Sequence, residues 1–189
     1  MESSNGPVDV ATSAYIWAYP LIAHKRLVDH STSPNVPPGP ITGPVNTFNN
    51  ARELMNASFT DVVRANADTL YSAAWIDLKK EPLVLQVPSI SYRYYVLQIT
   101  DAYTNNFFYI GTRTNVASGG TYLITGPNWD VSGANAIPYG IKSPTNTVAI
   151  ALRILVKGPE DISNVRALQD KFVLCPLSSH LLLSILYNS

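Results

Sequence analysis

The fold class is clearest in residues 69–100, which read TLYSAAWIDLKKEPLVLQVPSISYRYYVLQIT. Short runs rich in β-branched and aromatic residues alternate here with segments that carry Lys, Pro and Ser. Such runs are typical of strands joined by turns. The stretch therefore predicts three strands, at residues 69–78, 83–87 and 92–100.

The same texture continues toward the C-terminus. We expect further strands at residues 107–111, 120–125 and 148–156, with a weaker one at 137–142. Seven strands at this spacing are typical of a sandwich or jelly roll. No helical segments separate them, which argues against a doubly wound parallel sheet. The predicted fold is mainly β: an antiparallel β-sandwich or jelly-roll-like domain with an N-terminal helix and a short C-terminal helix.

The segment before the strands is expected to hold a helix and a strap. Within an N-terminal segment of residues 1–29, helical periodicity covers residues 8–29, and Pro20 should kink or end that helix. Five prolines make residues 30–46 a stiff strap lying across the domain, and residues 50–55 are expected to form one helical turn. The helix face that we expect to be apolar consists of Val10, Ala14, Trp17, Ala18 and Leu21.

The rest of the chain is assigned to the same single domain of residues 1–189. Its β body covers residues 60–157, and a C-terminal helix and tail cover residues 160–189. Asp161 or Ser163 should cap the helix, which has one apolar stripe. The stripe consists of Val165, Leu168, Gln169 and Phe172. We also expect a core that buries Trp17, Trp75, Leu97 and Ile150.

Composition limits the classes of partner. Thirteen Lys and Arg residues balance thirteen Asp and Glu residues, and no basic run exists, so no nucleic-acid partner is expected. The N-terminus lacks the features of a signal peptide, which favours a cytoplasmic location, and no apolar run is long enough to span a membrane. The single cysteine, Cys175, excludes an internal disulfide.

Standard catalytic and cofactor motifs are absent from the sequence, so neither a metal nor a cofactor is expected. His24, His30 and His180 lack a nearby set of acidic ligands, and we interpret them as surface or helix-end residues. Arg153 lies within a hydrophobic strand and must reach solvent or a partner. Asp77 and Asp101 are the carboxylates that we consider for that ion pair.

The densest polar cluster lies just before the first strand. Arg64 is suited to binding an anion, Asp68 to acting as a base or ligand, and Asn66 to holding a turn, with Tyr71 beside them. Arg64 and Asp68 could also pair with each other. A polar turn that leads into a strand explains the same residues without any ligand.

A second cluster covers residues 92–105. Alternation sends Arg93, Tyr95, Leu97 and Ile99 to one face, whereas Tyr94, Val96 and Gln98 lie on the other. Tyrosine rings beside amides, such as Tyr95 and Asn105, suit a sugar or another ring-shaped ligand. They suit cross-strand packing inside a sheet equally well. Asp101 is the catalytic candidate of this cluster.

The sequence resembles the family called domain of unknown function 1254. The matching motifs include AYIWAYPL at 14–21, VNTF at 45–48, VVRANADTLYS at 62–72, EPLVL at 81–85, RYY at 93–95, DAYTN at 101–105, GTR at 111–113, SPTNT at 143–147 and RALQD at 166–170. The resemblance implies an all-β body with accessory helices and, usually, a second domain of unknown function 1214. It supplies no catalytic residue.

This sequence departs from the family pattern in three ways, and the first is the missing signal peptide, since bacterial relatives often look exported. Ala65 stands where the family usually has proline, so the turn before Asn66 should be looser. The resemblance ends near Ser179, where the second domain usually begins, which suggests a truncated or stand-alone domain. The apolar tail at residues 181–186 would then favour self-association or a protein partner.

Two functions remain open at this point. The preferred one is a ligand-binding or structural, assembly domain. The alternative is an enzyme that acts on a small polar or carbohydrate-like substrate through a pocket formed by Arg64, Asp68, Asp101 and Tyr71.

Overall fold

The computed structural model describes residues 6–37, 39–60, 63–114, 119–129 and 137–187. Nine strands form within these residues, together with three α-helices and a short 3-10 helix. The strands are β1 (Asn49–Asn50), β2 (Thr69–Asp77), β3 (Leu83–Val87), β4 (Tyr95–Asp101), β5 (Asn106–Gly111), β6 (Gly120–Thr125), β7 (Tyr139–Lys142), β8 (Thr147–Leu155) and β9 (Val173–Pro176). The helices are α1 (Pro7–Ser31), η2 (Pro159–Asp161), α2 (Ile162–Gln169) and α3 (Leu177–Tyr187).

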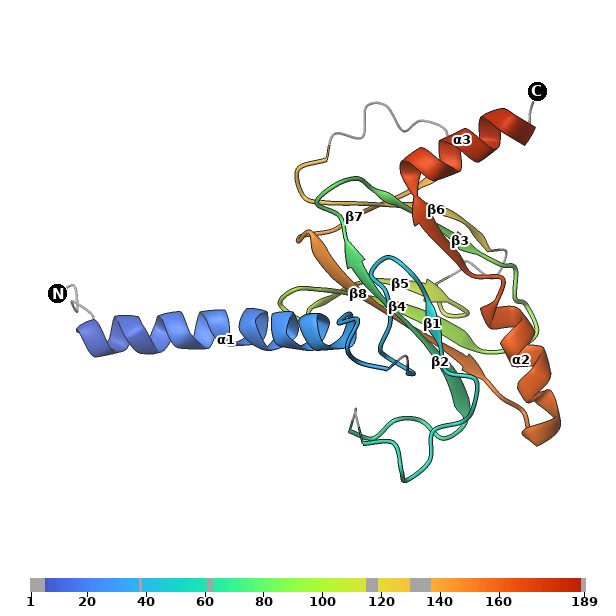
Figure 1. Ribbon diagram of the computed structural model, residues 1–189, viewed down its shortest axis with the longest axis horizontal. Coiled ribbons are helices and arrows are strands. Elements are labelled where there is room, and N and C mark those ends of the chain that lie inside the picture. Colours follow the sequence, from blue (N-terminus) through green and yellow to red (C-terminus); the bar gives the residue numbers. More distant parts are fainter. Residues whose placement is uncertain (1–5, 38, 61–62, 115–118, 130–136, 188–189) are drawn as a thin grey trace.

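The strands form two sheets that enclose the core (Figure 1). The first sheet has the order β1-β2-β8-β4-β5, and its neighbouring strands are antiparallel. The second sheet has the order β7-β6-β3-β9, in which β7 runs parallel to β6 and the other pairs are antiparallel. The predicted mainly β, two-sheet fold with an N-terminal helix and a short C-terminal helix is confirmed.

Alternation along the strands builds the core between the sheets. Strand β8 alternates half-buried and buried residues from end to end, because every second side chain points inward. The buried members of the core include Trp75, Leu97 and Ile150, as predicted. All seven predicted strands are present, with boundaries shifted by a few residues at most. Strands β1 and β9 are additional, and β1 replaces the helical turn expected at residues 50–55.

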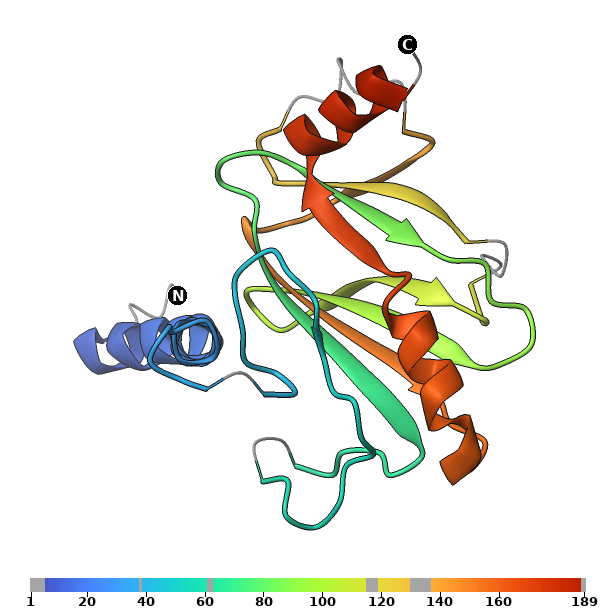
Figure 2. The ribbon, with the colours of Figure 1, turned by 45° about the vertical axis from the view of Figure 1, so that its right-hand side comes forward.

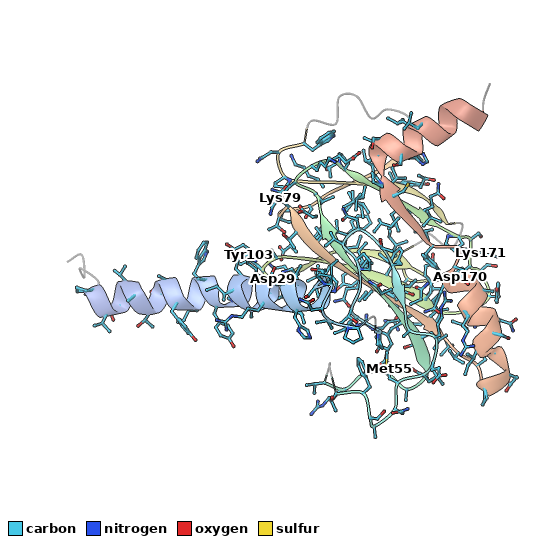
Figure 3. The ribbon with its side chains drawn as sticks, viewed as in Figure 1. Asp29, Met55, Lys79, Tyr103, Asp170 and Lys171 are labelled. Atoms are coloured by element: carbon cyan, nitrogen blue, oxygen red, sulfur yellow. The ribbon has the colours of Figure 1, made fainter. Side chains whose placement is uncertain are left out.

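Helix α1 extends away from the sandwich instead of lying on it (Figure 1). It does not end at Pro20, because the φ angle of proline is helical and the ring removes only one backbone donor. The expected burial of Trp17 is wrong. Its side chain is 65% exposed and meets the body at the ring of Tyr103, with 5.8 Å between ring centroids (Figure 3).

The C-terminal part of α1 docks on the sandwich through His24. This residue is buried, and its ring lies edge-on to Trp75 with 5.9 Å between centroids. Its Nε2 atom has no hydrogen-bond partner among the residues that the structure describes. The interpretation of His24 as a surface or helix-end residue is therefore wrong. Burial lowers the pKa of His24, and the negative charge of Asp101 offsets part of this effect.

The proline-rich segment after α1 runs along strand β2. Trp75 Nε1 donates to the carbonyl of Ile41 at 2.8 Å, and Asn46 N donates to the carbonyl of Trp75 at 2.8 Å. The Asn46 side chain in turn accepts a bond from Asp77 N at 2.9 Å. These bonds hold the segment against the outer side of the first sheet.

The C-terminal helices follow the sandwich along one side (Figure 2). The stripe predicted on α2 is buried, and Gln169 Nε2 donates to Tyr71 O at 2.8 Å and Ser72 Oγ at 3.1 Å. Asp161 occupies the N-cap position, but its carboxylate makes no capping bond because it binds Arg93 instead. The loop after β1 contacts the end of α2 through an ion pair between Arg52 and Asp170 (Figure 3).

The apolar tail forms helix α3 and lies at the end of the molecule away from the free end of α1 (Figures 1 and 2). Leu181 and Leu182 on this helix are exposed. Among the helices that the structure describes, none combines the length and the apolar character needed to cross a membrane.

Candidate functional site

The outer face of the first sheet presents polar and aromatic side chains at matched positions of four strands. Tyr71 of β2 lies opposite Arg153 of β8, and Gln98 of β4 lies opposite Tyr109 of β5. Ala151 of β8 is the partner of Gln98 on the other side. Because alanine is small, the sheet surface stays low between these larger side chains, which leaves room for a ligand.

Arg153 is held at the centre of this face by neutral groups. Its Nη1 atom donates to Gln98 Oε1 at 3.1 Å, and its guanidinium carbon lies 5.3 Å from the centroid of the Tyr71 ring. Such contacts orient a guanidinium and leave its positive charge uncompensated. The expected ion pair with Asp77 or Asp101 is wrong, because Arg153 pairs with no carboxylate among the described residues.

A first pocket, of about 340 Å³, opens between this face and the loop that precedes β2. The hydroxyl of Tyr71 accepts a bond from Asn66 N at 2.7 Å, which ties the loop to the sheet. Arg64 adopts a left-handed backbone conformation, with φ of 59°, that few non-glycine residues adopt. Met55, in the segment between β1 and β2, also lines this pocket (Figure 3). Its lining residues are Ile41, Met55, Phe59, Val63, Arg64, Ala65, Asn66, Tyr71, Gln98 and Arg153.

A second pocket, of about 420 Å³, adjoins the first, because Gln98 and Arg153 line both. The Arg113 guanidinium carbon lies 5.9 Å from the centroid of the Tyr94 ring at its edge. Gly111 lies so close to β4 that a Cβ atom there would collide with the Tyr95 carbonyl. The lining residues are Tyr94, Tyr95, Val96, Gln98, Tyr109, Gly111, Arg113, Thr114 and Arg153. We call the two cavities the arginine pockets.

The arginine pockets are electropositive. Arg64, Arg113 and Arg153 line them, and no Asp or Glu does so among the described lining residues. Guanidinium groups stay protonated in proteins. None of the three forms an ion pair with a described carboxylate. An anion that entered these pockets would therefore meet positive charge.

Three of the candidate residues from the sequence come together here. Arg64, Asn66 and Tyr71 line the first pocket. Tyr95 belongs to the second pocket, but it is fully buried, and its ring lies 6.1 Å from that of Phe172 within the core. Burial raises the pKa of Tyr95.

The other candidates lie apart from these pockets. Asp68 is exposed, does not pair with Arg64, and contributes its backbone carbonyl to a bond from Val156 N at 2.8 Å. Asp101 is buried, and its Oδ1 atom accepts bonds from the backbone amides of Tyr103 and Asn105, both at 2.9 Å. Its Oδ2 atom accepts a bond from the Asn105 side chain at 3.2 Å, so that Asp101 holds the turn between β4 and β5.

Sequence reasoning identified only part of the pocket lining. Strand alternation had placed Gln98 on the face opposite Leu97, and Arg153 stood out as a charge within an apolar strand. Neither signal showed that the two side chains meet, because β4 and β8 are far apart in sequence. Tyr109 and Arg113 carried no local signal, since only the pairing of β5 with β4 brings them to this face.

Comparisons with known proteins identify the family of the chain. The VPA0106 protein of Vibrio parahaemolyticus is similar in structure, with a TM-score of 0.76 and 23% identity over 92% of this chain and 39% of VPA0106. An uncharacterized protein from Burkholderia cenocepacia matches with a TM-score of 0.43 and 12% identity, over 71% of this chain and 36% of that protein. No curated protein matches the sequence.

At 23% identity the likeness to VPA0106 concerns the fold alone, and this chain spans about two fifths of the length of VPA0106. Residues 45–176 match the family described as "Protein of unknown function (DUF1254)". The match includes all nine of the strands described above and covers more than half of the chain. The chain therefore belongs to the DUF1254 family.

Proposed function

We propose that this protein binds a small anionic molecule in the arginine pockets on the outer face of its first sheet. The observation that carries the proposal is the position of Arg153. It lies in the shared wall of the two pockets, is held by an amide and a ring, and lacks a carboxylate partner among the described residues.

The lining suggests the chemistry of the ligand. Guanidinium groups bind carboxylates and phosphates with paired, charge-assisted hydrogen bonds. The rings of Tyr71 and Tyr109 offer apolar surface beside these charges, which suits a flat or ring-shaped ligand body. Pockets of roughly 300–1,000 Å³ are typical of small-molecule sites, and the volumes of about 340 and 420 Å³ fall in that range. We therefore expect a carboxylate or phosphate attached to a small ring.

A thermal-shift and calorimetry panel tests the proposal. Acetate, benzoate, phthalate, inorganic phosphate and phenyl phosphate serve as probes, because a molecule that binds only the folded state raises the melting temperature. We expect the ring-bearing anions to raise it more than acetate does. Replacing Arg153 with Met should weaken their binding at least tenfold, since hydrogen bonds to charged groups contribute roughly 1.5–3 kcal/mol.

Two control variants sharpen the panel. Arg26→Met removes an exposed arginine of α1 and should leave binding unchanged. Asp68→Asn should also leave it unchanged, because Asp68 does not line either pocket. If no anion raises the melting temperature, or if Arg153→Met binds as well as the wild type, the proposed site is wrong. Loss of binding in Asp68→Asn would instead favour the enzyme hypothesis.

A further inference from the structure

Large apolar side chains surround helix α1, and the exposed ones are Val8, Val10, Tyr15, Ile16, Trp17, Tyr19, Ile22 and Leu27. One side faces the sandwich at the C-terminal end, where His24 is buried and Val28 is half-buried. Because an α-helix has 3.6 residues per turn, Val8, Tyr15 and Ile22 lie on the other side, roughly 150° away. Val8 and Tyr15 belong to the part of the helix that extends away from the sandwich, whereas Ile22 also borders the cavity between α1 and β2.

The outward side is widely exposed. The exposed fractions are 77% for Val8, 66% for Tyr15 and 50% for Ile22. No Asp, Glu, Lys or Arg occurs between Asp9 and Lys25, over about four turns of helix. A contiguous apolar strip of this kind on a surface marks a contact with another molecule.

The outward side has the spacing of a helix–helix seam. Positions 8, 11, 15, 18 and 22 alternate by three and four residues, which keeps them on one stripe that a second helix can follow. Large side chains at Val8, Tyr15 and Ile22 alternate along this stripe with small ones at Ala11 and Ala18. Large and small residues on facing helices interdigitate when each large side chain lies opposite a small one.

We propose that this stripe packs against the same stripe of a second copy of the chain, with the two α1 helices antiparallel. A two-fold axis between residues 16 and 17 places Tyr15 opposite Ala18 of the second copy. The same axis places Ile22 opposite Ala11 of the second copy. Tyr15 and Ile22 then each meet an alanine, Val8 lies opposite the aliphatic part of Lys25, and the symmetry repeats these contacts.

Charge and register select this arrangement. Antiparallel pairing brings the end of α1 that carries Asp9 beside the end of the second copy that carries Arg26, so opposite charges meet at both ends. It also opposes the two helix dipoles, which is favourable. Parallel pairing would place Tyr15 on Tyr15 and Arg26 beside Arg26. The inference does not depend on the proposed ligand, because no residue of the stripe lines the arginine pockets.

Sedimentation equilibrium of the full 189-residue chain tests the inference. We expect a reversible dimer whose fraction rises with protein concentration. Ala18→Glu places two carboxylates inside the seam and should weaken the dimer at least tenfold. Ala23→Glu is the matched control, because it makes the same change on an exposed alanine of the same helix, about 100° from the centre of the stripe. It should change the dissociation constant by less than about twofold, since an exposed position there has little to lose.

Cysteine cross-linking tests the direction of the helices. In a Cys175→Ser background, oxidation should join the chains of the double variant Ala11→Cys/Ile22→Cys, and neither single variant should cross-link. Efficient cross-linking of Ala11→Cys alone would show a parallel pair and overturn the proposed register. Circular dichroism of each variant shows that α1 remains helical.

Three results would overturn the inference as a whole. The first is a chain that stays monomeric at every concentration reached, including one that instead sediments with phosphatidylcholine vesicles. The second is a dimer that Ala18→Glu and Ala23→Glu weaken equally. The third is a dimer lost on deletion of residues 180–189, which would assign self-association to α3.

Discussion

At the scale of single residues, a buried ion pair joins the segment before β4 to the segment before α2. Arg93 Nη1 and Nη2 donate to the two carboxylate oxygens of Asp161 at 2.6 and 2.9 Å. Lys157 N and the Asn164 side chain complete the bonds to the carboxylate, at 3.0 and 3.1 Å. The Arg93 guanidinium and these bonds hold the pKa of Asp161 well below its usual range.

Replacing Arg93 with Met should destabilise the protein strongly. The change leaves the Asp161 carboxylate buried without its counter-charge, and breaking a buried pair from one side typically costs about 3–5 kcal/mol. Urea unfolding at neutral pH measures the loss. The double variant Arg93→Met/Asp161→Leu should recover most of it, because no charge then stays buried.

The exposed pair between Lys25 and Asp29 is the comparison for this prediction. Lys25→Met should cost only about 0.3–0.5 kcal/mol, as is usual for an exposed pair one helical turn apart. If Arg93→Met cost no more than Lys25→Met, the pair would contribute nothing beyond a surface contact.

The sequence predicted where Arg93 points but not what it meets. Alternation placed it on the same face as Leu97 and Ile99, and its side chain is indeed buried. Its partner lies 68 residues away in a segment that reads as a helix cap. From its sequence position alone, Asp161 is expected to cap the helix. Only the folded sheet brings the Arg93 guanidinium close to it.

At the scale of elements, strands with clear periodicity could be predicted and short or isolated elements could not. Strand β9 has four residues and ends in Pro176, so no alternation is visible, and its existence depends on pairing with β3. The apolar spacing of α1 predicts the helix correctly, but it also predicts the burial of Trp17, which is exposed. The same spacing occurs on a helix face that the described residues leave exposed. Sequence alone does not separate a face buried in the chain's own core from an exposed one.

The docking of α1 should weaken in acid because of His24. Burial keeps the folded-state pKa of His24 below the ordinary value of 6.5, so the unfolded chain binds a proton more readily. Above pH 6.5 both states are neutral, and the stability does not depend on this group. As the pH falls below 6.5, the unfolded state gains the proton first and the free energy of unfolding decreases.

The variant His24→Phe should remove this part of the pH dependence and keep an aromatic ring beside Trp75. Urea unfolding at pH values of about 7.5 and 5.5, on either side of the ordinary histidine pKa, measures it. His30→Phe is the control, because His30 lies exposed at the end of the same helix, and this variant should keep the wild-type pH dependence. An unchanged pH dependence in His24→Phe would contradict the argument.

At the scale of the whole molecule, the candidate site is a product of strand order. Residues from β2, β8, β4 and β5 reach the arginine pockets because these strands are neighbours in one sheet, although β4 and β8 are distant in the chain. Sequence motifs identified Arg64, Asn66 and Tyr71, which lie within a few residues of one another. The other half of the lining depends on pairing across the sheet, which local patterns do not encode.

The free part of α1 should contribute to association and not to the stability of the sandwich. Residues 7–16 are exposed, so the described part of the segment that is removed by deleting residues 1–16 buries little apolar area. In dilute solution, the urea midpoint of the shortened chain should therefore equal that of the wild type. At high concentration the wild type should become more stable, because dimer formation favours the folded state, whereas the shortened chain should not.

Deleting residues 1–28 instead removes His24 and Val28 and should lower the midpoint at any concentration. A loss of stability on removing residues 1–16 in dilute solution would show that the free end packs on its own body, and it would leave no stripe for a second copy to bind.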